Sequence, residues 1–378
     1  MRVFVIAGEP SGDALGGALM AGLTSLQPDV VFDGVGGPLM HGQGLTSRFD
    51  MSELSVMGIA EVLPKYRHLK RRIREMADAV IETKPDVLIT IDSPDFCLRV
   101  AKLVKAASDI RTVHYVAPSV WAWRPKRAAK MARCVDHVLA LLPFEPPYMH
   151  AAGMACDFVG HPVVAEPVAN PEQARAFRAE HRLTDADPLV LVLPGSRRGE
   201  VGRLGPVFGA ALSQLQARYP KMRAVSVVAP NVAELIGETV AQWAVKPVLI
   251  PGSNMDAKRA AFAAADIALA ASGTVALELA ASGTPMVIGY RMKPLSHWII
   301  SKMALIDSAN LVNIITETRH VPECLGPGCT PQALTDAMMN VLQDPARQHQ
   351  VMAETMDALG QGGDAPGLRA ARAVLSRL

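Results

Sequence analysis

The chain has 378 residues, 50% of them hydrophobic and 20% charged, a globular composition long enough for two hydrophobic cores. Its formal net charge of +2 gives no strong overall field, so nucleic acid is not an expected partner. The five cysteines include no C-x-x-C pair, which argues against a zinc site or a disulfide framework and for reduced thiols in the cytoplasm.

The first residues, "MRVFVIAGEPSGD", indicate a strand and a turn and not a signal peptide, because they lack a long apolar region and a small-residue cleavage site. No window reaches the roughly 18 apolar residues that a membrane span needs. Any contact with a membrane is therefore expected to be peripheral.

Short apolar runs alternate with helical periodicity along the chain. They predict strands at 2–7, 30–35, 86–91, 111–116, 137–141, 156–159, 189–193, 223–228, 247–250, 266–270 and 285–289. Helical stretches fall between most of these runs, which is typical of a parallel, doubly wound α/β sheet. The strands are almost continuously apolar, as expected when helices cover both faces of a sheet.

A segment rich in prolines and charges, 160–188, interrupts this alternation and predicts a linker with one helix. We therefore expect one Rossmann-like domain at 1–165, a second at 166–350 and a helical tail at 351–378. The last helical stretch, 364–378, could pack on either domain. Such folds bind ligands at the carboxyl ends of their strands, so a cleft lined by both sheets is the expected site.

The first strand leads into a glycine-rich turn, "AGEPSGDALGG". It is not a G-x-G-x-x-G sequence, and no acidic residue follows the second strand at the dehydrogenase position, so a nicotinamide cofactor is not expected. Gly8 and Gly12 would let backbone amides face a ligand at a helix N-terminus. A tight turn with Ser11 or Asp13 as helix cap explains the same residues.

The third strand ends at Asp92, and Asp95 follows Ser93 and Pro94. A carboxylate at the carboxyl end of a parallel strand is well placed to act as a general base. Asp95 could instead cap the following helix.

Two further turns in the second half predict a nucleotide site. "LPGSRRGEV" follows a strand, and its arginine Arg197 has the fork geometry that matches phosphate oxygens. "ASGTVALELAASG" also follows a strand; Gly273 and Thr274 open a helix whose free amides suit a diphosphate, and Glu278 lies one turn later, where it could accept ribose hydroxyls. The structural alternatives are Thr274 as a simple cap and Glu278 as a solvated helix residue.

Several long motifs, in order, make the chain similar to the lipid-A-disaccharide synthase family from about residue 3 to 325. They are "AGEPSGD", "IDSPDF", "HYVAPSVWAWRPKR", "LLPFE", "VGHP", "LPGSR", "SGTVALELAASGTPMVIGYR" and "NLVNIITE". The resemblance implies a GT-B fold and the inverting transfer of 2,3-diacylglucosamine from its UDP derivative to 2,3-diacylglucosamine 1-phosphate, giving a β(1→6) disaccharide and UDP. Pro10 departs from the alanine usual in the family.

The resemblance also implies roles for residues. Asp92 matches the family's catalytic base, and Arg197 is the expected cation on the leaving diphosphate, with Arg198 as its nearest competitor. The expected UDP-sugar contacts are Ser196, Arg197, Gly273, Thr274, Glu278, Tyr290, Arg291 and Asn313. The expected contacts with the acceptor are Gly8, Glu9, Ser11, Gly12, Trp121, Trp123 and Arg124.

No metal or other cofactor is expected. Many metal-dependent transferases hold a cation with Asp-x-Asp at a strand end, but the "DAD" sequence here, 185–187, precedes a strand and reads as a solvated turn. His161, between a glycine and a proline at the domain junction, is expected to be structural.

The segment 55–82 predicts a membrane-facing helix with a buried stripe of Leu69, Ile73, Met76 and Val80. The expected contacts with an anionic membrane are Val56, Met57, Ile59, Leu63, Lys65, Arg67, Lys70, Arg71, Arg72 and Arg74. A solvated charged face is the alternative. With the family resemblance, this places the protein in the cytoplasm, peripherally on the inner face of the inner membrane.

Two other functions stay open from the sequence. One is a UDP-GlcNAc 2-epimerase-like enzyme of the same fold, which would act on a UDP-sugar without an acceptor. The other is a non-catalytic protein that binds lipid or nucleotide.

Overall fold

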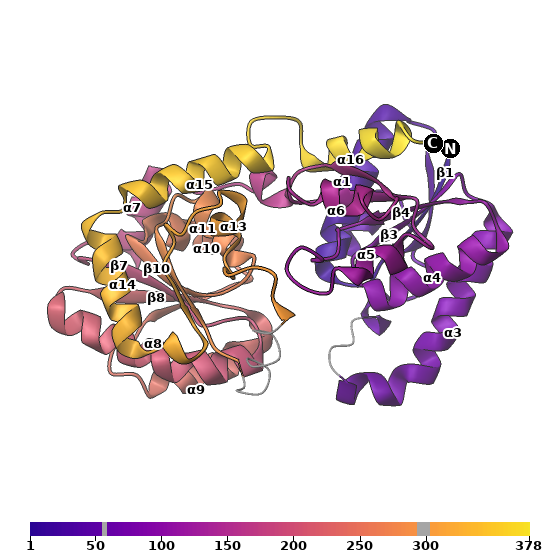
Figure 1. Ribbon diagram of the computed structural model, residues 1–378. Coiled ribbons are helices and arrows are strands. Elements are labelled where there is room, and N and C mark those ends of the chain that lie inside the picture. The colour runs from indigo at the N-terminus through magenta and orange to yellow at the C-terminus, as the bar shows by residue number, and fades with distance from the viewer. Residues whose placement is uncertain (55–58, 293–302) are drawn as a thin grey trace. The chain divides into compact units, whose positions relative to one another are not determined.

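The computed structural model describes residues 1–54, 59–292 and 303–378, and for 59–66 the backbone alone. The chain forms two compact units (Figure 1). Unit 1 comprises Met1–Ala165 and Leu359–Leu378, and unit 2 comprises Glu166–Ala358.

Unit 1 is built on a parallel six-stranded sheet in the order β2-β1-β3-β4-β5-β6. Its strands are β1 (Arg2–Ala7), β2 (Val31–Val35), β3 (Val87–Ile91), β4 (Arg111–Tyr115), β5 (His137–Ala140) and β6 (Ala155–Phe158). Its helices are α1 (Pro10–Leu26), α2 (Pro38–His41), α3 (Ile59–Thr83), α4 (Pro94–Ala107), α5 (Lys126–Met131), α6 (Pro146–His150) and α16 (Pro366–Leu375).

Unit 2 repeats the plan with a parallel sheet in the order β12-β11-β10-β7-β8-β9. Its strands are β7 (Leu189–Leu193), β8 (Arg223–Val228), β9 (Val248–Pro251), β10 (Ile267–Ala271), β11 (Met286–Tyr290) and β12 (Glu323–Leu325). Its helices are α7 (Pro171–Glu180), α8 (Arg198–Arg218), α9 (Ala233–Ala241), α10 (Met255–Ala264), α11 (Val275–Ala281), α13 (Leu311–Ile315), α14 (Pro331–Gln343) and α15 (Ala346–Leu359).

All eleven predicted strands are present, each within one residue of its predicted ends. The inner strands β3, β7 and β10 are buried at every residue, because helices cover both faces of each sheet, whereas the outer strands β2, β6 and β9 are partly exposed. The sequence analysis missed β12, a three-residue strand that pairs with β11 at the sheet edge. It is too short and too polar to produce an apolar run.

The C-terminal segment 351–378 is not a separate tail. Helix α15 remains in unit 2 up to Ala358, and the chain then returns to unit 1, where α16 packs against α1. The two helices approach closely at Gly22, where a Cβ atom would lie 2.6 Å from the carbonyl oxygen of Gly367. Arg377 then binds Asp157 with two hydrogen bonds, of 2.6 and 3.0 Å.

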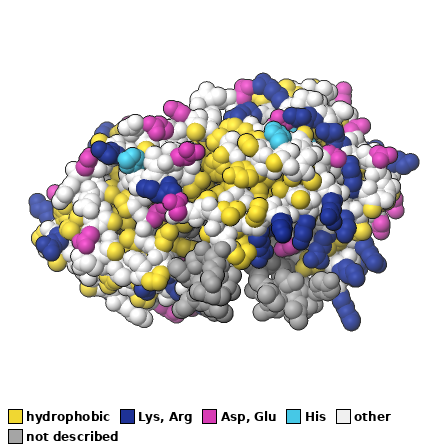
Figure 2. Space-filling view, viewed as in Figure 1, with side chains coloured by type: hydrophobic (Ala, Val, Ile, Leu, Met, Phe, Trp, Pro, Cys, Tyr) yellow, Lys and Arg dark blue, Asp and Glu magenta, His cyan; other side chains and the backbone are white. Residues whose placement is uncertain are grey.

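Helix α3 carries the predicted buried stripe: Ile73, Met76 and Val80 are buried and Leu69 is half-buried. The side chains of Arg67, Lys70, Arg71 and Arg74 are exposed. In Figure 2, lysine and arginine side chains gather over the region where Figure 1 labels α3, α4 and α5.

Arg72, an expected membrane contact, is already bound within unit 1. Its guanidinium donates two hydrogen bonds to the carboxylate of Glu53, of 2.8 and 2.9 Å, and lies 4.3 Å from the ring centroid of Phe49. Arg72 therefore anchors α3 to the segment before it. Val56 and Met57 lie outside the described residues, as do the side chains of Ile59, Leu63 and Lys65.

Asp13 is a buried carboxylate that joins α1 to α2. It accepts hydrogen bonds from the backbone amides of Gly37, Leu39 and Met40, at 2.9 to 3.0 Å. Asp13 was a candidate cap of its own helix, but its carboxylate caps the start of α2. These amides have no partner within α2, so the carboxylate satisfies donors that burial would otherwise leave unpaired.

We expect Asp13→Ala to destabilise unit 1, because three buried amides lose their acceptor. The expected loss is about 2 kcal/mol of unfolding free energy, or a Tm lower by about 4–8 °C for a unit of this size. Differential scanning calorimetry would measure it, with the exposed Asp29→Ala as control. An equal Tm for the two variants would contradict this role.

Candidate active site

The carboxyl edge of the unit 1 sheet is shaped by two consecutive residues in the left-handed region. Asp92 has φ +50° and Ser93 has φ +41°, although neither is glycine. Each such residue costs about 1–2 kcal/mol and persists only where its surroundings hold it. The backbone amide of Asp92 donates to the carbonyl of Tyr115 at 3.0 Å, and the carbonyl of Ser93 accepts from the amide of Cys97 at 3.0 Å.

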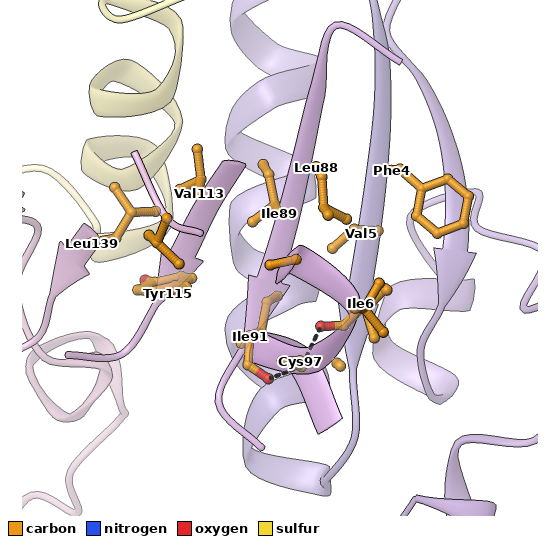
Figure 3. Close-up of a cluster of buried hydrophobic side chains, with 14 of the residues drawn as sticks. Phe4, Val5, Ile6, Leu88, Ile89, Ile91, Cys97, Val113, Tyr115 and Leu139 are labelled. Atoms are coloured by element: carbon orange, nitrogen blue, oxygen red, sulfur yellow. Dashed lines mark hydrogen bonds between the residues drawn. The ribbon is translucent and has the colours of Figure 1, made fainter. Parts of the chain in front are cut away.

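The buried core fixes this edge from below (Figure 3). The ends of β1 and β3 lie side by side, with Ala7 opposite Ile91 in the register. The thiol of Cys97 in α4 lies 3.9 Å from the carbonyl oxygens of both Ile6 and Ile91. The start of α4 is thus packed onto both strand ends. Asp92 is half-buried and lies in the short connection between β3 and α4.

The glycine-rich turn after β1 lies against the same edge. A Cβ atom on Gly8 would lie 2.6 Å from the hydroxyl of Ser93, so only glycine allows this approach. Gly12 is buried, Glu9 is half-buried and Ser11 is exposed. The structure therefore brings the "AGEPSGD" and "IDSPDF" motifs together, as parallel pairing of β1 and β3 requires.

Asp95 does not cap α4. The N-cap residue is Ser93, and Asp95 lies inside the first turn with an exposed side chain. Pro94 starts the helix one position after Ser93, which leaves Asp95 too late to act as the cap. Its negative charge near the helix N-terminus is still favourable.

The two tryptophans of "WAWRPKR" have different roles. Trp121 is buried, packs edge-on against Phe144 with ring centroids 5.0 Å apart, and donates from Nε1 to Glu145 at 3.2 Å. Its ring belongs to the core, so the expected contact of Trp121 with an acceptor stays a prediction that its buried position does not support. Trp123 is half-buried, and the guanidinium of the exposed Arg124 lies 4.2 Å from its ring centroid.

Glu145 is a buried carboxyl group that the sequence analysis did not single out. It also accepts a hydrogen bond from the backbone amide of Leu142, at 3.0 Å. Desolvation is the largest influence and raises the pKa of Glu145 from 4.5 to about 7. Glu145 joins the "WAWRPKR" loop to the "LLPFE" turn at this edge of the sheet.

Unit 2 has a pocket of about 470 Å³ at the carboxyl edge of its own sheet. Five predicted UDP-sugar contacts line it: Ser196, Arg197, Gly273, Thr274 and Glu278. The turns after β7 and β10 supply them, and these strands are neighbours in the sheet. The pocket thus joins two motifs that lie about 75 residues apart in the sequence.

The Glu200 carboxylate accepts hydrogen bonds from backbone amides of the "PGSR" turn. Its Oε2 accepts from the amides of Ser196 and Arg197, at 3.2 and 3.3 Å, and its Oε1 lies 3.4 Å from the Arg197 guanidinium. An anion that binds these amides must displace this carboxylate. The Arg197 side chain is 69% exposed, and its guanidinium contacts the same carboxylate.

The "SGTVALE" turn forms the other wall of the pocket. Gly273 has φ +158°, and Thr274 precedes α11 without a side-chain capping bond, so the simple capping role is not realised. Glu278 is not merely solvated: its Oε2 forms an ion pair with the ammonium of Lys258 in α10.

Three predicted contacts do not line the pocket. Asn313 is fully buried, and its side chain bonds both backbone groups of Val321 and the carboxylate of Glu323, at 2.8 to 3.0 Å. Its amide group holds the chain before β12, so its contact with the donor stays a prediction that these bonds do not support. Tyr290 and Arg291 are half-buried at the end of β11.

Two histidines near strand ends are structural. His114 is buried and its Nδ1 lies 2.8 Å from the Thr90 hydroxyl; burial lowers its pKa to about 4. Burial also lowers the pKa of His161 to about 4, and its Nδ1 accepts from the amide of Val163. Both observations agree with the expectation that His161 is structural, which stays a prediction.

All five cysteines are free thiols. The described residues contain no group of three or more side chains suited to a metal ion, and none of the described helices is long and apolar enough to cross a membrane.

We expect stability to depend on the ionisation of Glu145. Between about pH 4.5 and pH 7 the folded protein retains a proton that the unfolded chain releases, so the free energy of unfolding falls as the pH rises through this window. The loss is on the order of 3 kcal/mol. Glu145→Gln should remove it, so that the variant gains stability relative to wild type between pH 5 and pH 8.

Thermal melting at pH 5, 6, 7 and 8 would measure this difference. The exposed Glu180→Gln serves as control and should follow the wild-type profile. Parallel profiles for Glu145→Gln and wild type would disprove the assignment.

Comparison with known proteins identifies the relatives of this chain. A model of the lipid-A-disaccharide synthetase family matches residues 3–366. A lipid-A-disaccharide synthase of Ruegeria pomeroyi is 63% identical over 384 residues, covering 100% of this chain and 96% of that protein. The synthase of Rhodospirillum centenum is 48% identical and covers 100% of this chain and 94% of its own.

Solved structures with the same fold include a UDP-GlcNAc 2-epimerase from Neisseria meningitidis bound to UDP-GlcNAc. Its TM-score is 0.66 at 14% identity, covering 100% of this chain and 99% of that chain. A glycosyltransferase from Rickettsia africae has a TM-score of 0.60 at 12% identity, covering 99% and 96%. These identities show the fold alone, and they confirm the predicted GT-B class of two Rossmann-like units. Because the family model and the close relatives extend over nearly the whole chain, the chain belongs to the lipid-A-disaccharide synthetase family.

Proposed function

We propose that this protein transfers 2,3-diacylglucosamine from its UDP derivative to 2,3-diacylglucosamine 1-phosphate, releasing UDP. Family membership makes it a glycosyltransferase of lipid A biosynthesis. The observation that carries the finer proposal is the unit 2 pocket, where the "LPGSR" and "SGTVALE" motifs meet.

In this proposal the pocket holds the UDP part of the donor. Glu278 accepts the ribose hydroxyls, and the turn at Gly273 and Thr274 faces the diphosphate. Arg197 turns from Glu200 towards the leaving diphosphate and stabilises the charge that builds up on it. The exposure of the Arg197 side chain and the polar lining of the pocket support these roles.

Asp92 is the proposed general base of unit 1. Its carboxylate takes the proton of the acceptor 6-hydroxyl while that oxygen attacks the anomeric carbon. The new C–O bond forms on the face opposite to the breaking bond to UDP, which gives the β(1→6) linkage with inversion. A strained backbone held by the core supports this role, because such strain persists where a side chain must be fixed for function.

We propose no metal for this reaction. Arg197 supplies positive charge at the pocket, and the "DAD" sequence precedes β7 and thus lies at the amino end of that strand. The reaction should therefore continue in the presence of EDTA.

The epimerase alternative shares the fold, as the neighbour from Neisseria meningitidis illustrates. An epimerase would convert the UDP-sugar without an acceptor, and a non-catalytic binding protein would give no product. Incubation with both acylated substrates, followed by mass spectrometry for disaccharide and UDP, distinguishes these three functions.

We expect Asp92→Asn to fold normally and to lose turnover by about 10²–10⁴-fold, the usual contribution of a positioned base. Single-turnover mass spectrometry with saturating donor and acceptor would measure it. Asp95→Asn, three residues away and exposed, is the matched control and should keep near-normal turnover. Near-normal turnover of Asp92→Asn would exclude Asp92 as the base.

We also propose that unit 1 docks on the inner face of the inner membrane, where acylated substrates reside. The exposed cations Arg67, Lys70, Arg71 and Arg74 on α3 support this proposal. Each cation near an anionic leaflet contributes roughly 1 kcal/mol, and the attraction is screened by salt.

Flotation with anionic vesicles in low salt tests the docking surface. We expect the triple change Lys70→Ser, Arg71→Ser and Arg74→Ser to weaken binding by about 10-fold or more. A control with the same loss of charge on unit 2 combines Arg175→Ser, Arg218→Ser and Lys221→Ser, all at exposed residues. Equal retention of both triple variants on the vesicles would refute the assignment to α3.

A further inference from the structure

The pocket of unit 2 contains a cation that no motif predicts. Lys258 lies on α10, whereas Glu278, its partner in the ion pair, lies on α11. Both residues line the pocket. The pair therefore joins two walls of the pocket that belong to separate helices.

Lys258 is the more buried member of the pair. Its side chain is 23% exposed, against 38% for Glu278. Its ammonium lies 5.6 Å from the ring centroid of Phe262, one turn further along α10. Phe262 is itself buried and lines the same pocket. An aromatic face attracts a cation, so the lysine is fixed from within its own helix.

Stability alone does not account for this pair. Ion pairs with this degree of exposure contribute about 0–1 kcal/mol to folding. A long glutamate side chain on a short helix has several rotamers available, and the fixed ammonium selects the one that keeps the carboxylate at the pocket wall.

We infer that Lys258 is a positioning residue for nucleotide recognition. It orients the Glu278 carboxylate so that this group accepts hydrogen bonds from the two ribose hydroxyls. This inference rests on the proposed function of the pocket and adds a residue to it. It predicts that Lys258 acts only through Glu278, and only on ligands that carry those hydroxyls.

Isothermal titration calorimetry with UDP and with 2′,3′-dideoxy-UDP tests the inference. Lys258→Met should weaken UDP binding by about tenfold, because the Glu278 carboxylate that accepts hydrogen bonds from both ribose hydroxyls is no longer held in place. Its effect on 2′,3′-dideoxy-UDP should be less than about twofold, because that ligand makes no use of Glu278. Lys258→Arg, which keeps the charge, should restore most of the affinity for UDP.

Two controls separate positioning from structure. Arg259→Gln changes the neighbouring cation of α10, which pairs with Asp256 and Glu166 and does not line the pocket, so it should bind both ligands normally. In the background of Glu278→Gln, Lys258→Met should cause no further loss, because the group through which it acts is gone.

Equal losses for the two ligands, or no loss for UDP, would overturn the inference while leaving the pocket as a nucleotide site. Failure of the wild-type protein to bind UDP would instead reject the proposed nucleotide site, and the role of Lys258 with it.

Discussion

Parallel pairing of the strands is the constraint on which both candidate sites depend. Every strand of a parallel sheet delivers its carboxyl end to the same edge, so residues distant in sequence meet there. At these ends the chain must turn sharply from a buried strand into a helix. Unit 2 makes its turns with the glycines Gly195 and Gly273, which adopt positive φ at little cost. In unit 1 the turn after β3 has Asp92 and Ser93 at positive φ instead of glycine, so polar side chains are present where the backbone is strained.

The strands of the core were predictable because burial on both faces leaves a continuous apolar run in the sequence. The turns were predictable for a related reason: a short "PGSR" or "SGT" sequence carries its own conformational preference. The pocket could therefore be anticipated from two local patterns and the rule that neighbouring strands end at one edge. Among the strands of the described residues, β12 alone was not predicted, because three residues at a sheet edge carry no pattern.

The partners of polar side chains were not predictable in this way. Arg72 belongs to a basic run, but its partner Glu53 lies 19 residues earlier, and Asn313 belongs to a family motif, but its partners lie in the chain before and within β12. Lys258 occurs in an ordinary helical stretch and meets Glu278 only in the tertiary structure, where both side chains line the pocket. Periodicity predicts which face of an element is buried, whereas the choice of an ionic partner depends on tertiary structure.

In the proposed function, the charges of the pocket serve both the binding and the release of the nucleotide. Two cations, Arg197 and Lys258, and two carboxylates, Glu200 and Glu278, line it, and each cation is paired. The pairs differ in mobility, since Arg197 is 69% exposed and Lys258 only 23%. In the proposed reaction the Arg197 guanidinium leaves Glu200 and binds the diphosphate. The backbone amides of the "PGSR" turn also release Glu200 and bind the diphosphate. After transfer, Glu200 competes with UDP for the amides and the guanidinium, which favours departure of UDP. This competition does not weaken contacts that form only in the transition state.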